Sequence, residues 1–406
     1  MSTTTKTVKR SFSIQYIPFS HTHTARQQQQ QLATMKVSSS FSFGGGPRRF
    51  VLVVAIMCLG EKSRMFCQAW GKVGHEMIGN LAWQLLDADI QEVVRHILNV
   101  TSTNTTITQH KDDDNTTLTP LGAVADWADT VRHTHAYAWS GPLHYIDVRN
   151  DACDDHDANH RQVTTADCSD FVWSRDCPDD WCVAGAIQNY TSRLLLTPTT
   201  TDPLKFVTHF VGDMHQPLHV SRTTDRGGNN ISVHTDFHAP TTDSTHLRLR
   251  RLDTRTTHHH TNLHGVWDDV LIETYQKENC HNDWTEMQGV VWDMITQASH
   301  SDTKWHQWTQ CANGGRHVCV DTWAQESWDL AKHAAYIHVN GTQIQPNDTL
   351  PREYYEQRIP VVMEQLAKAA VRLAFTLTVH LSDAAAAADD DDDHGNLLDS
   401  VLLSST

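Results

Sequence analysis

The chain has 406 residues, with 48 Asp and Glu against 32 Lys and Arg and a formal net charge of −16. Its length allows one large domain or two ordinary ones, each with an ample core. The first 69 residues hold nine Lys and Arg and one Glu, so the remainder carries a net charge of −24. A body this acidic excludes a general polyanion binder that works by long-range attraction, and a phosphate-bearing substrate would need local cations.

The first 69 residues have the character of a secretory leader. Basic residues precede about ten apolar ones in segment 49–64, and Ala69 is a small residue suited to a cleavage site. That run falls short of the roughly 20 residues that span a bilayer, which makes a membrane-tethered form the weaker alternative. We expect a signal peptide cleaved before Trp70 and a protein that is secreted or held in an endomembrane or vacuolar lumen. Met35 is a more natural start than Met1, so residues 1–34 are read as an extension of the gene model.

Sequons and cysteines agree with an oxidising compartment. A glycoprotein is indicated by seven Asn-x-Ser/Thr sequons, at Asn99, Asn104, Asn115, Asn189, Asn230, Asn340 and Asn347. Cys58 and Cys67 leave with the leader, and Cys280 is the expected odd thiol. The other six cysteines are expected in disulfides, since four crowd one loop-rich region and two form a close pair: Cys153, Cys168, Cys177, Cys182, Cys311 and Cys319. A zinc site is the weaker reading of the four, because they lack paired Cys-x-x-Cys spacing.

Apolar residues recur at three- and four-residue spacing along most of the mature chain, which predicts an all-α fold. Helices are expected at 75–98, 202–216, 262–278, 322–339 and 352–381, the last bent or started at Pro360. Two glycines followed by alternation at 227–237 predict a small β-hairpin. Residues from about 238 to 261 are expected to form a polar loop insertion, and the Asp-rich tail 382–406 to be disordered. The organisation is therefore a leader, one helical domain at 70–381 and a tail.

Two His–Asp pairs at helical spacing point to metal chemistry. His209 and Asp213 are i and i+4 in one apolar helix, and His264 and Asp268 repeat this spacing in another. Such neighbours share a helix face and can bind one ion, although a single pair is more often a surface ion pair. With other residues the candidate donors number eight: His75, Asp129, His144, His209, Asp213, His219, His264 and Asp268. Since zinc takes about four ligands, either several ions cluster or some of these are ordinary core groups.

Six motifs, in order, resemble those of a known family. They are WGKVGH, WADTVR, PLHYID, HFVGDMHQPLHV, GGNNI and NLHGVWD, between about residues 70 and 380. They are similar to the zinc-dependent single-strand nucleases of fungi and plants, the S1/P1 nuclease family, whose fold bacterial zinc phospholipases C share. The resemblance implies a multi-helix domain with a three-zinc cleft.

The resemblance also implies a role for each candidate. One zinc would be held by Asp129, His144, His209 and Asp213, and a third by His219, His264 and Asp268. A second would take the amino nitrogen and carbonyl oxygen of Trp70, with His75 and a bridging Asp213. Arg132 and Asp147 match a paired catalytic arginine and aspartate beside the first zinc, and His215 matches no ligand. Tyr145 is either a platform for base stacking or a core residue.

The amino terminus has a special part in this scheme. An α-amino group binds a metal only when it is free and deprotonated, and its ordinary pKa of about 8 lets zinc displace the proton at mild pH. While Ala69 is attached, the nitrogen of Trp70 is an amide and no ligand. Cleavage before Trp70 would therefore create a ligand.

The expected function is hydrolysis of single-stranded DNA and RNA to 5′-nucleotides by a monomeric zinc endonuclease, with 3′-nucleotidase activity. A zinc phospholipase C is one alternative. Its third metal site resembles a His-x-x-x-Glu pair, whereas this chain has His264 and Asp268, which favours the nuclease. A catalytically silent zinc-binding glycoprotein is the other. Gly79 and Ala125 stand where plant relatives usually carry a cysteine pair, so one disulfide is missing. The insertion is expected to alter substrate access and to leave the metal cluster intact.

Overall fold

The computed structural model describes residues 70–100, 107–108, 117–149, 169–194, 200–237, 259–311 and 319–389. All of them belong to one compact unit, Met65–Thr406, whereas the unit Met1–Arg64 lies outside the described residues. The leader up to residue 69, Cys153, Cys168, insertion residues 238–258 and tail residues 390–406 are also outside them. The expectations for these segments stay predictions.

Helices make up most of the described unit, which confirms the all-α prediction. They are α2 Gly71–Leu85, α3 Ala88–Leu98, α4 Pro120–Val124, α5 Trp127–Val131, α6 Trp173–Asp176, α7 Val183–Thr191, α8 Asp202–Met214, α9 Leu263–Gly265, α10 Leu271–Asn279, α11 Trp284–Ser299, α12 Asp302–Thr309, α13 Val320–Leu330 and α14 Arg352–Asp389. Tighter or wider turns extend or join them: the 3₁₀ segments η1 Ala138–His144, η4 Pro178–Asp180 and η5 Pro217–His219, and the π segments η6 Val266–Val270 and η7 Ala331–Ala335.

The strands are short and form three small sheets. β1 Ile107–Thr108 pairs antiparallel with β2 Thr117–Leu118, and β3 Ile146–Val148 pairs parallel with β4 Val220–Arg222. β5 Ser232–Thr235 lies between antiparallel β6 His259–Asn262 and parallel β7 Asp348–Leu350. The strand predicted within 227–237 is present as β5, but the hairpin predicted there is not, because the antiparallel partner of β5 is β6, on the far side of the insertion. β6 includes residues 259–261, which were expected to be loop, because they pair with β5 in register Thr235 to His259.

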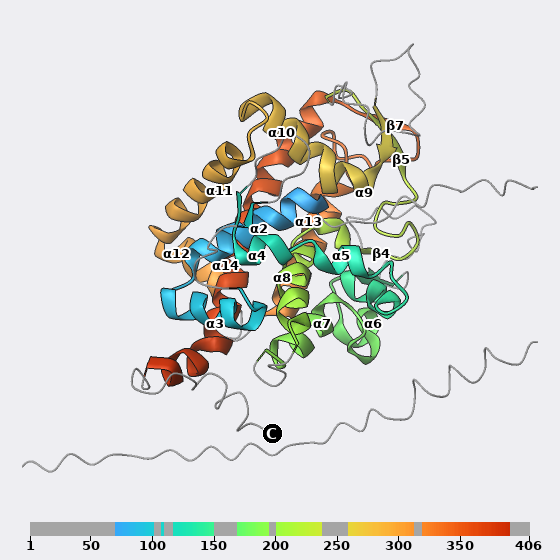
Figure 1. Cartoon of the computed structure of the whole chain (residues 1–406). Helices are drawn as coiled ribbons and strands as arrows, with labels where there is room; N and C mark the ends of the chain where they lie inside the picture. The colour runs from blue at the N-terminus through green and yellow to red at the C-terminus, as the bar shows by residue number, and fades with distance from the viewer. Residues whose placement is uncertain are drawn as a thin grey trace, which may run out of the picture. The chain divides into compact units, whose positions relative to one another are not determined.

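α8 is the central helix of the unit and is buried on nearly every side. Phe206 and Phe210 stack with ring centroids 5.1 Å apart, and Leu204, Val207 and Val211 are fully buried around them. Each such side chain stabilises the fold by about 1.5–3 kcal/mol. α7, α2 and α14 pack against this helix (Figure 1). Any polar side chain that α8 carries is therefore held inside the protein by rigid neighbours.

Residues 75–98 form two helices where one was expected. The break is at Leu86, which is extended at φ −77° and ψ 138°, and at Asp87, the N-cap of α3. α2 then packs closely on α4, since a Cβ on Gly79 would lie 2.8 Å from the backbone of Gly122. A larger side chain at residue 79, such as the cysteine of the resemblance, would require α4 to move.

α14 begins at Arg352 and runs through Pro360, so Pro360 does not start it. The helix continues to Asp389, into the alanine run that was expected to belong to the disordered tail. It packs against α2, α3, α8 and α11 and crosses the unit behind them (Figure 1). This one helix thus connects elements that are distant in the sequence.

Two disulfides are present among the described residues. Cys311 bonds to Cys319 and Cys280 is free and buried, as predicted, and Cys177 bonds to Cys182, a pairing that the sequence left open. In the part of the chain that the structure describes, no helix is both long enough and apolar enough to cross a membrane.

Candidate metal centre

α8 presents His209 and Asp213 on one face, as their spacing predicts. His209 Nε2 lies 3.3 Å from Asp213 Oδ2, and both side chains are fully buried. His75 approaches from α2, with Nε2 3.3 Å from Asp213 Oδ1 and its ring stacked on that of His209 at 3.9 Å. Potential ligand atoms of the three residues lie within 4.8 Å of one another, close enough to share an ion.

A second group shares His209 and draws on α5 and η1. Asp129 Oδ1 lies 3.5 Å from His144 Nδ1 and 3.7 Å from His209 Nε2. Ligand atoms of these three residues also lie within 4.8 Å of one another. Asp213 Oδ2 lies 3.0 Å from His144 Nδ1, whereas its Oδ1 faces His75. The two oxygens of Asp213 therefore face different groups, which suits a bridging carboxylate.

The third group lies where η5 and the α9–η6 turn meet. His264 Nε2 is 3.2 Å from His219 Nε2 and 3.3 Å from Asp268 Oδ2. All three side chains are buried, and their ligand atoms again lie within 4.8 Å. Asp268 sits on the π segment η6, so the i, i+4 pair is held by a wider turn than an ordinary α-helix.

Backbone carbonyls set the ring orientation of three of these histidines. Nδ1 of His209 donates to Ala125 O at 2.7 Å. Nδ1 of His219 and of His264 donate at 2.6 Å to the carbonyls of His144 and Gly227. A carbonyl only accepts, so each Nδ1 carries a proton and the neutral ring directs the lone pair of Nε2 into its group. His144 thus contributes a side chain to one group and orients a member of another.

The buried carboxylates require positive charge. No hydrogen bond within the described residues reaches either oxygen of Asp129 or Asp213, or either ring nitrogen of His75. Buried unpaired groups are costly. Burial alone would lower the pKa of His209, but the charges of Asp213 and Asp129 raise it to about 9. A metal cation would replace that proton, and a set of imidazoles and carboxylates fits zinc.

Trp70 stands at the start of α2, fully buried beside these groups. Its backbone is left-handed, with φ 40°, and its indole Nε1 donates to Gly212 O at 2.9 Å. Gly212 also packs on His75, since a Cβ there would lie 2.7 Å from His75 Nδ1. The same turn of α8 therefore contacts both residues that the resemblance assigns to the second zinc.

Gln216 is a residue of this centre that the sequence patterns did not single out. Its Nε2 donates to Asp268 Oδ1 at 2.6 Å, and its Oε1 accepts from Leu218 N at 2.5 Å. It orients one ligand candidate and shapes the turn that leads to His219. In the sequence, Gln216 is a single amide residue between the candidate ligands Asp213 and His219. Helical spacing gives it no partner, so the pattern did not reveal its role.

Arg132 and Asp147 are not paired in the structure. Arg132, which is 9% exposed, places NH2 3.0 Å from Asp129 Oδ1. Asp147 lies on β3, where partial burial of its carboxyl group raises the pKa, with the charge of Arg226 acting in the opposite direction. Tyr145 is partly buried next to His144, and its carbonyl accepts from Val183 N at 3.1 Å. Arg132 thus forms an ion pair with the ligand candidate Asp129.

His215, for which the resemblance gives no ligand role, is packed away from the metal groups. Its Nδ1 donates to Val211 O at 2.6 Å, and its Nε2 accepts from Arg372 at 2.8 Å. Burial, with the charge of Arg372, lowers the pKa of His215 to about 3. It is a neutral link between α8 and α14.

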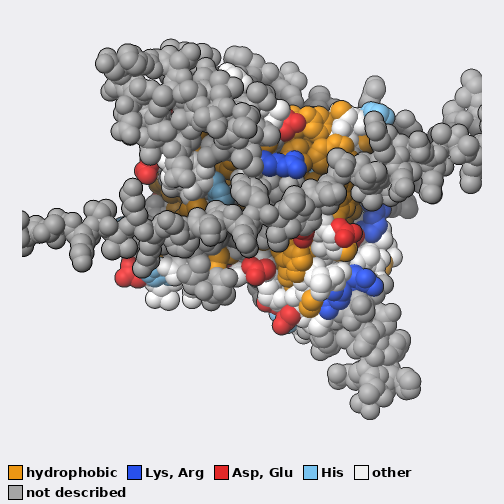
Figure 2. Space-filling model, turned by 90° about the horizontal axis from the view of Figure 1, so that it is seen from below, with side chains coloured by type: hydrophobic (Ala, Val, Ile, Leu, Met, Phe, Trp, Pro, Cys, Tyr) orange, Lys and Arg blue, Asp and Glu red, His pale blue; other side chains and the backbone are white. Residues whose placement is uncertain are grey.

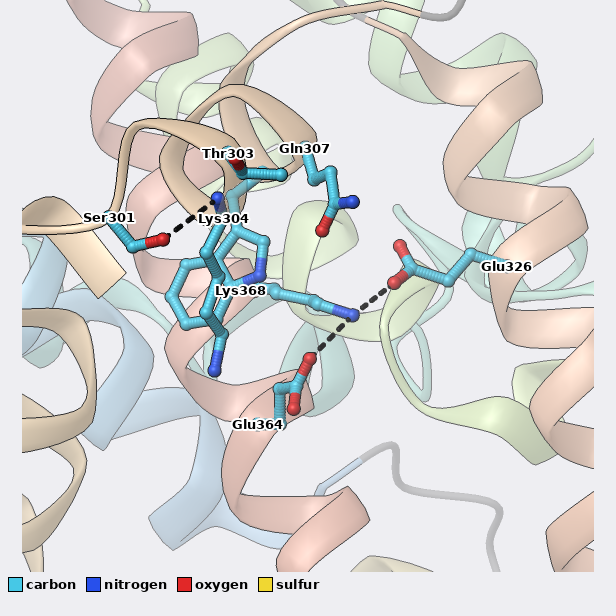
Figure 3. A pocket seen from close by; sticks show the side chains of 8 residues that line it. Ser301, Thr303, Lys304, Gln307, Glu326, Glu364 and Lys368 are labelled. Atoms are coloured by element: carbon cyan, nitrogen blue, oxygen red, sulfur yellow. Dashed lines mark hydrogen bonds and ion pairs between the residues drawn. The ribbon is translucent and has the colours of Figure 1, made fainter. Parts of the chain in front are cut away.

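Two surface cavities among the described residues lie apart from the metal groups. One of about 410 Å³ lies between α12, α13 and α14 (Figure 3). The other, of about 830 Å³, is lined by residues 171–173 and by α13 residues between Asp321 and Leu330. Neither is lined by a candidate ligand.

Comparison with known proteins agrees with this geometry. A family model described as S1/P1 Nuclease matches residues 70–382. Endonuclease 1 of Arabidopsis thaliana is 32% identical over 349 residues, covering 82% of this chain and 94% of that protein. Endonuclease 2 of the same plant is 33% identical over 322 residues (76% and 89%). Nuclease S1 of Aspergillus oryzae is 29% identical over 345 residues (81% and 96%). The family match spans every candidate ligand and the relatives are nucleases, so the chain is a hydrolase of phosphodiester bonds. It belongs to the S1/P1 nuclease family.

Proposed function

We propose that this nuclease is a secreted, monomeric zinc enzyme that cuts single-stranded DNA and RNA to 5′-nucleotides and also removes 3′-phosphates from nucleotides. The observation that carries the proposal is the set of three buried His/Asp groups, in which the oxygens of Asp129 and Asp213 receive no hydrogen bond within the described residues.

Each of the three groups would hold one zinc ion. The ligands would be Asp129, His144, His209 and Asp213 for the first ion, Trp70 nitrogen and oxygen with His75 and Asp213 for the second, and His219, His264 and Asp268 for the third. When bound, zinc acts as a Lewis acid that makes water nucleophilic near neutral pH and neutralises charge on the phosphate and the leaving oxygen. The carbonyls of Ala125, His144 and Gly227 keep the imidazoles aimed at their ions.

Local cations would hold the substrate phosphate. The face seen in Figure 2 mixes acidic, basic and apolar side chains where it is not covered by grey atoms, and it shows no broad basic surface. Arg132 is placed beside Asp129 and would bind the non-bridging phosphate oxygens in a bidentate manner. Asp147 on β3 would be the catalytic aspartate that accompanies Arg132. Tyr145 would stack on a base of the substrate.

Maturation would complete the site. Cleavage of the signal peptide before Trp70 would free the nitrogen that binds the second ion. Support comes from the burial of Trp70 against α8, beside His75 and Asp213.

The experiment is to express the full chain in a secretory host and to sequence the amino terminus, count zinc and measure hydrolysis. We expect a protein that begins at Trp70, holds three zinc ions and cuts a single strand faster than a duplex of the same sequence, leaving 5′-phosphates. Chelation should stop hydrolysis and zinc should restore it. Hydrolysis of phosphatidylcholine micelles without nuclease activity would favour the phospholipase. Bound zinc without turnover would favour the silent glycoprotein.

A further inference from the structure

Two tryptophans are exposed side by side on the surface. Trp139 is 43% and Trp181 is 51% exposed, and their ring centroids lie 6.5 Å apart with planes at 45°. The Nε1 of Trp139 donates to Ala136 O at 2.9 Å, which fixes that indole relative to the backbone. Large aromatic rings left in water are unfavourable, and a paired set on a surface is typical of a binding site.

The pair is connected to the metal centre through η1 and through packed rings. Trp139 and His144 both lie on η1. The ring of Trp139 contacts Phe206 at 5.9 Å, and Phe206 stacks on Phe210 at 5.1 Å. Phe210 in turn contacts His144 edge-on at 5.1 Å. Trp139 is thus the surface end of a short series of rings that begins at a ligand candidate.

Trp181, which lies just before α7, is connected to the same segment as Trp139. It lies two residues before Val183, whose amide donates to the carbonyl of Tyr145 at 3.1 Å. Tyr145 directly follows His144, so both tryptophans flank the segment that carries the ligand candidate and the proposed stacking residue.

Two cations lie over rings that pack on Phe206, the same residue that Trp139 contacts. Lys205 Nζ lies 4.8 Å from the ring of Trp127, and Trp127 contacts Phe206. Arg193 lies over Tyr190, which stacks on the other side of Phe206 at 4.6 Å. Two cations therefore flank the aromatic series.

The neighbouring carboxylates are engaged. Asp202 accepts a hydrogen bond from the hydroxyl of Tyr137 at 2.7 Å, and Asp180 accepts one from Trp173 Nε1 at 2.8 Å. Both donors are neutral, so these hydrogen bonds fix the two carboxylates in place without cancelling their charge.

We propose that Trp139 and Trp181 form a subsite that stacks unpaired bases of a single-stranded substrate on one side of the metal centre. The inference rests on the proposed nuclease function. A single strand can place a base on an indole face while a neighbouring phosphate enters the centre. A duplex cannot, because its bases are already stacked and paired, so the subsite favours single strands.

The test compares an oligothymidylate of ten nucleotides with an abasic strand of the same length, which has the same phosphates and no bases. Stacking contributes a factor of roughly 5 to 150 per base. Trp139→Ala and Trp181→Ala should therefore each lower the ratio of kcat/KM for thymidylate to that for the abasic strand by about that factor. Trp139→Phe should keep most of the ratio, and Trp139→Leu, which is apolar but has no ring, should not. Val339→Ala, at a 40% exposed apolar residue elsewhere, is the matched control and should change nothing.

Zinc content and melting temperature, measured for each variant, keep folding defects out of the comparison. Ratios for both alanine variants within twofold of wild type would overturn the subsite and leave the nuclease proposal standing. Failure of the wild-type protein to cut either strand would overturn the proposed function itself, and the inference with it.

Discussion

Asp213 is the residue on which the most contacts of the centre converge. It is fully buried, and its two oxygens face imidazoles from α2, η1 and α8 at 3.0 to 3.3 Å. The charges of His209 and His144 outweigh the effect of burial and hold the pKa of Asp213 well below its usual range. Its carboxylate thus belongs to one group and also contacts His144 of the next.

Replacing Asp213 with Ala should remove more than one ion. Because both oxygens are lost, we expect zinc content to fall by two of the three ions assigned to the three groups, whereas Asp268→Ala should cost one. Elemental analysis of the purified proteins measures this. Asp293→Ala, at an exposed residue of α11, is the control. Equal losses in the Asp213 and Asp268 variants would contradict a bridging role.

Arg132→Ala should impair catalysis and spare metal binding. Loss of one cation that contacts the transition state lowers kcat by about 10²–10³. Zinc content should stay at the wild-type value, since the guanidinium contacts Asp129 without being a ligand. Arg132→Lys should recover little, because an ammonium group lacks the planar fork. Steady-state kinetics on single-stranded DNA decide, and an unchanged kcat would rule out this role.

At this scale the sequence predicted side chains that repeat at helical spacing and missed those that act through the backbone. His209 with Asp213 and His264 with Asp268 could be paired by counting along a helix. Gln216 and the carbonyls of Ala125 and Gly227 could not, since their partners depend on how separate elements meet. The ion pair of Arg132 with Asp129 is an i, i+3 contact at the end of α5, so helical spacing could have given it, whereas the resemblance pointed to Asp147 on β3.

Elements were predicted best where apolar periodicity was long. α8 lies within a predicted helix, and α13 overlaps the first half of another. The division between α2 and α3 was missed, because it depends on two residues with extended backbone, which apolar periodicity does not reveal. The strand β6 was missed because His259, His260 and Thr261 are polar and gain their conformation only by pairing with β5. A local residue pattern cannot predict strand pairing between segments that are far apart in the sequence.

The segment between β5 and β6 should be dispensable for metal binding. Deleting residues 240–258 leaves residues 236–239 to join the paired positions Thr235 and His259, a loop length that a hairpin accommodates. The third group lies just beyond β6 and keeps its position through the β5–β6 register. We expect unchanged zinc content, with a changed KM for long substrates. Loss of zinc from a folded deletion protein would refute this.

The unit is held together across its sequence by contacts between α13 and α14. Glu326 on α13 accepts from Arg372 NH1 at 2.7 Å and pairs with Lys368, both on α14. Figure 3 shows Lys368 between Glu326 and Glu364 at the wall of the cavity. Arg372 also donates to His215 on α8 and to Trp308 O on α12, so one buried cation connects four helices.

Glu326→Gln should therefore reduce the stability of the whole molecule in a pH-dependent way. Burial would raise the pKa of Glu326, but Arg372 and Lys368 lower it from 4.5 to about 2. A lowered pKa stabilises the fold above the unfolded value, and this contribution is lost as the pH falls from about 4.5 to about 2. We expect the variant to lose about 3 kcal/mol of unfolding free energy at pH 7. Urea titrations at pH 7, 4 and 3 should show the difference narrowing. A constant difference would contradict the assignment.

The burial of Trp70 has a practical consequence for anyone who makes this protein. Its indole is bonded to Gly212 and the residue is buried, and under the proposed maturation any residue left before Trp70 would keep its nitrogen as an amide that binds no metal. If cleavage before Trp70 creates the ligand proposed above, an affinity tag should be placed after α14, and protein made without a leader peptidase should bind less zinc than the secreted form.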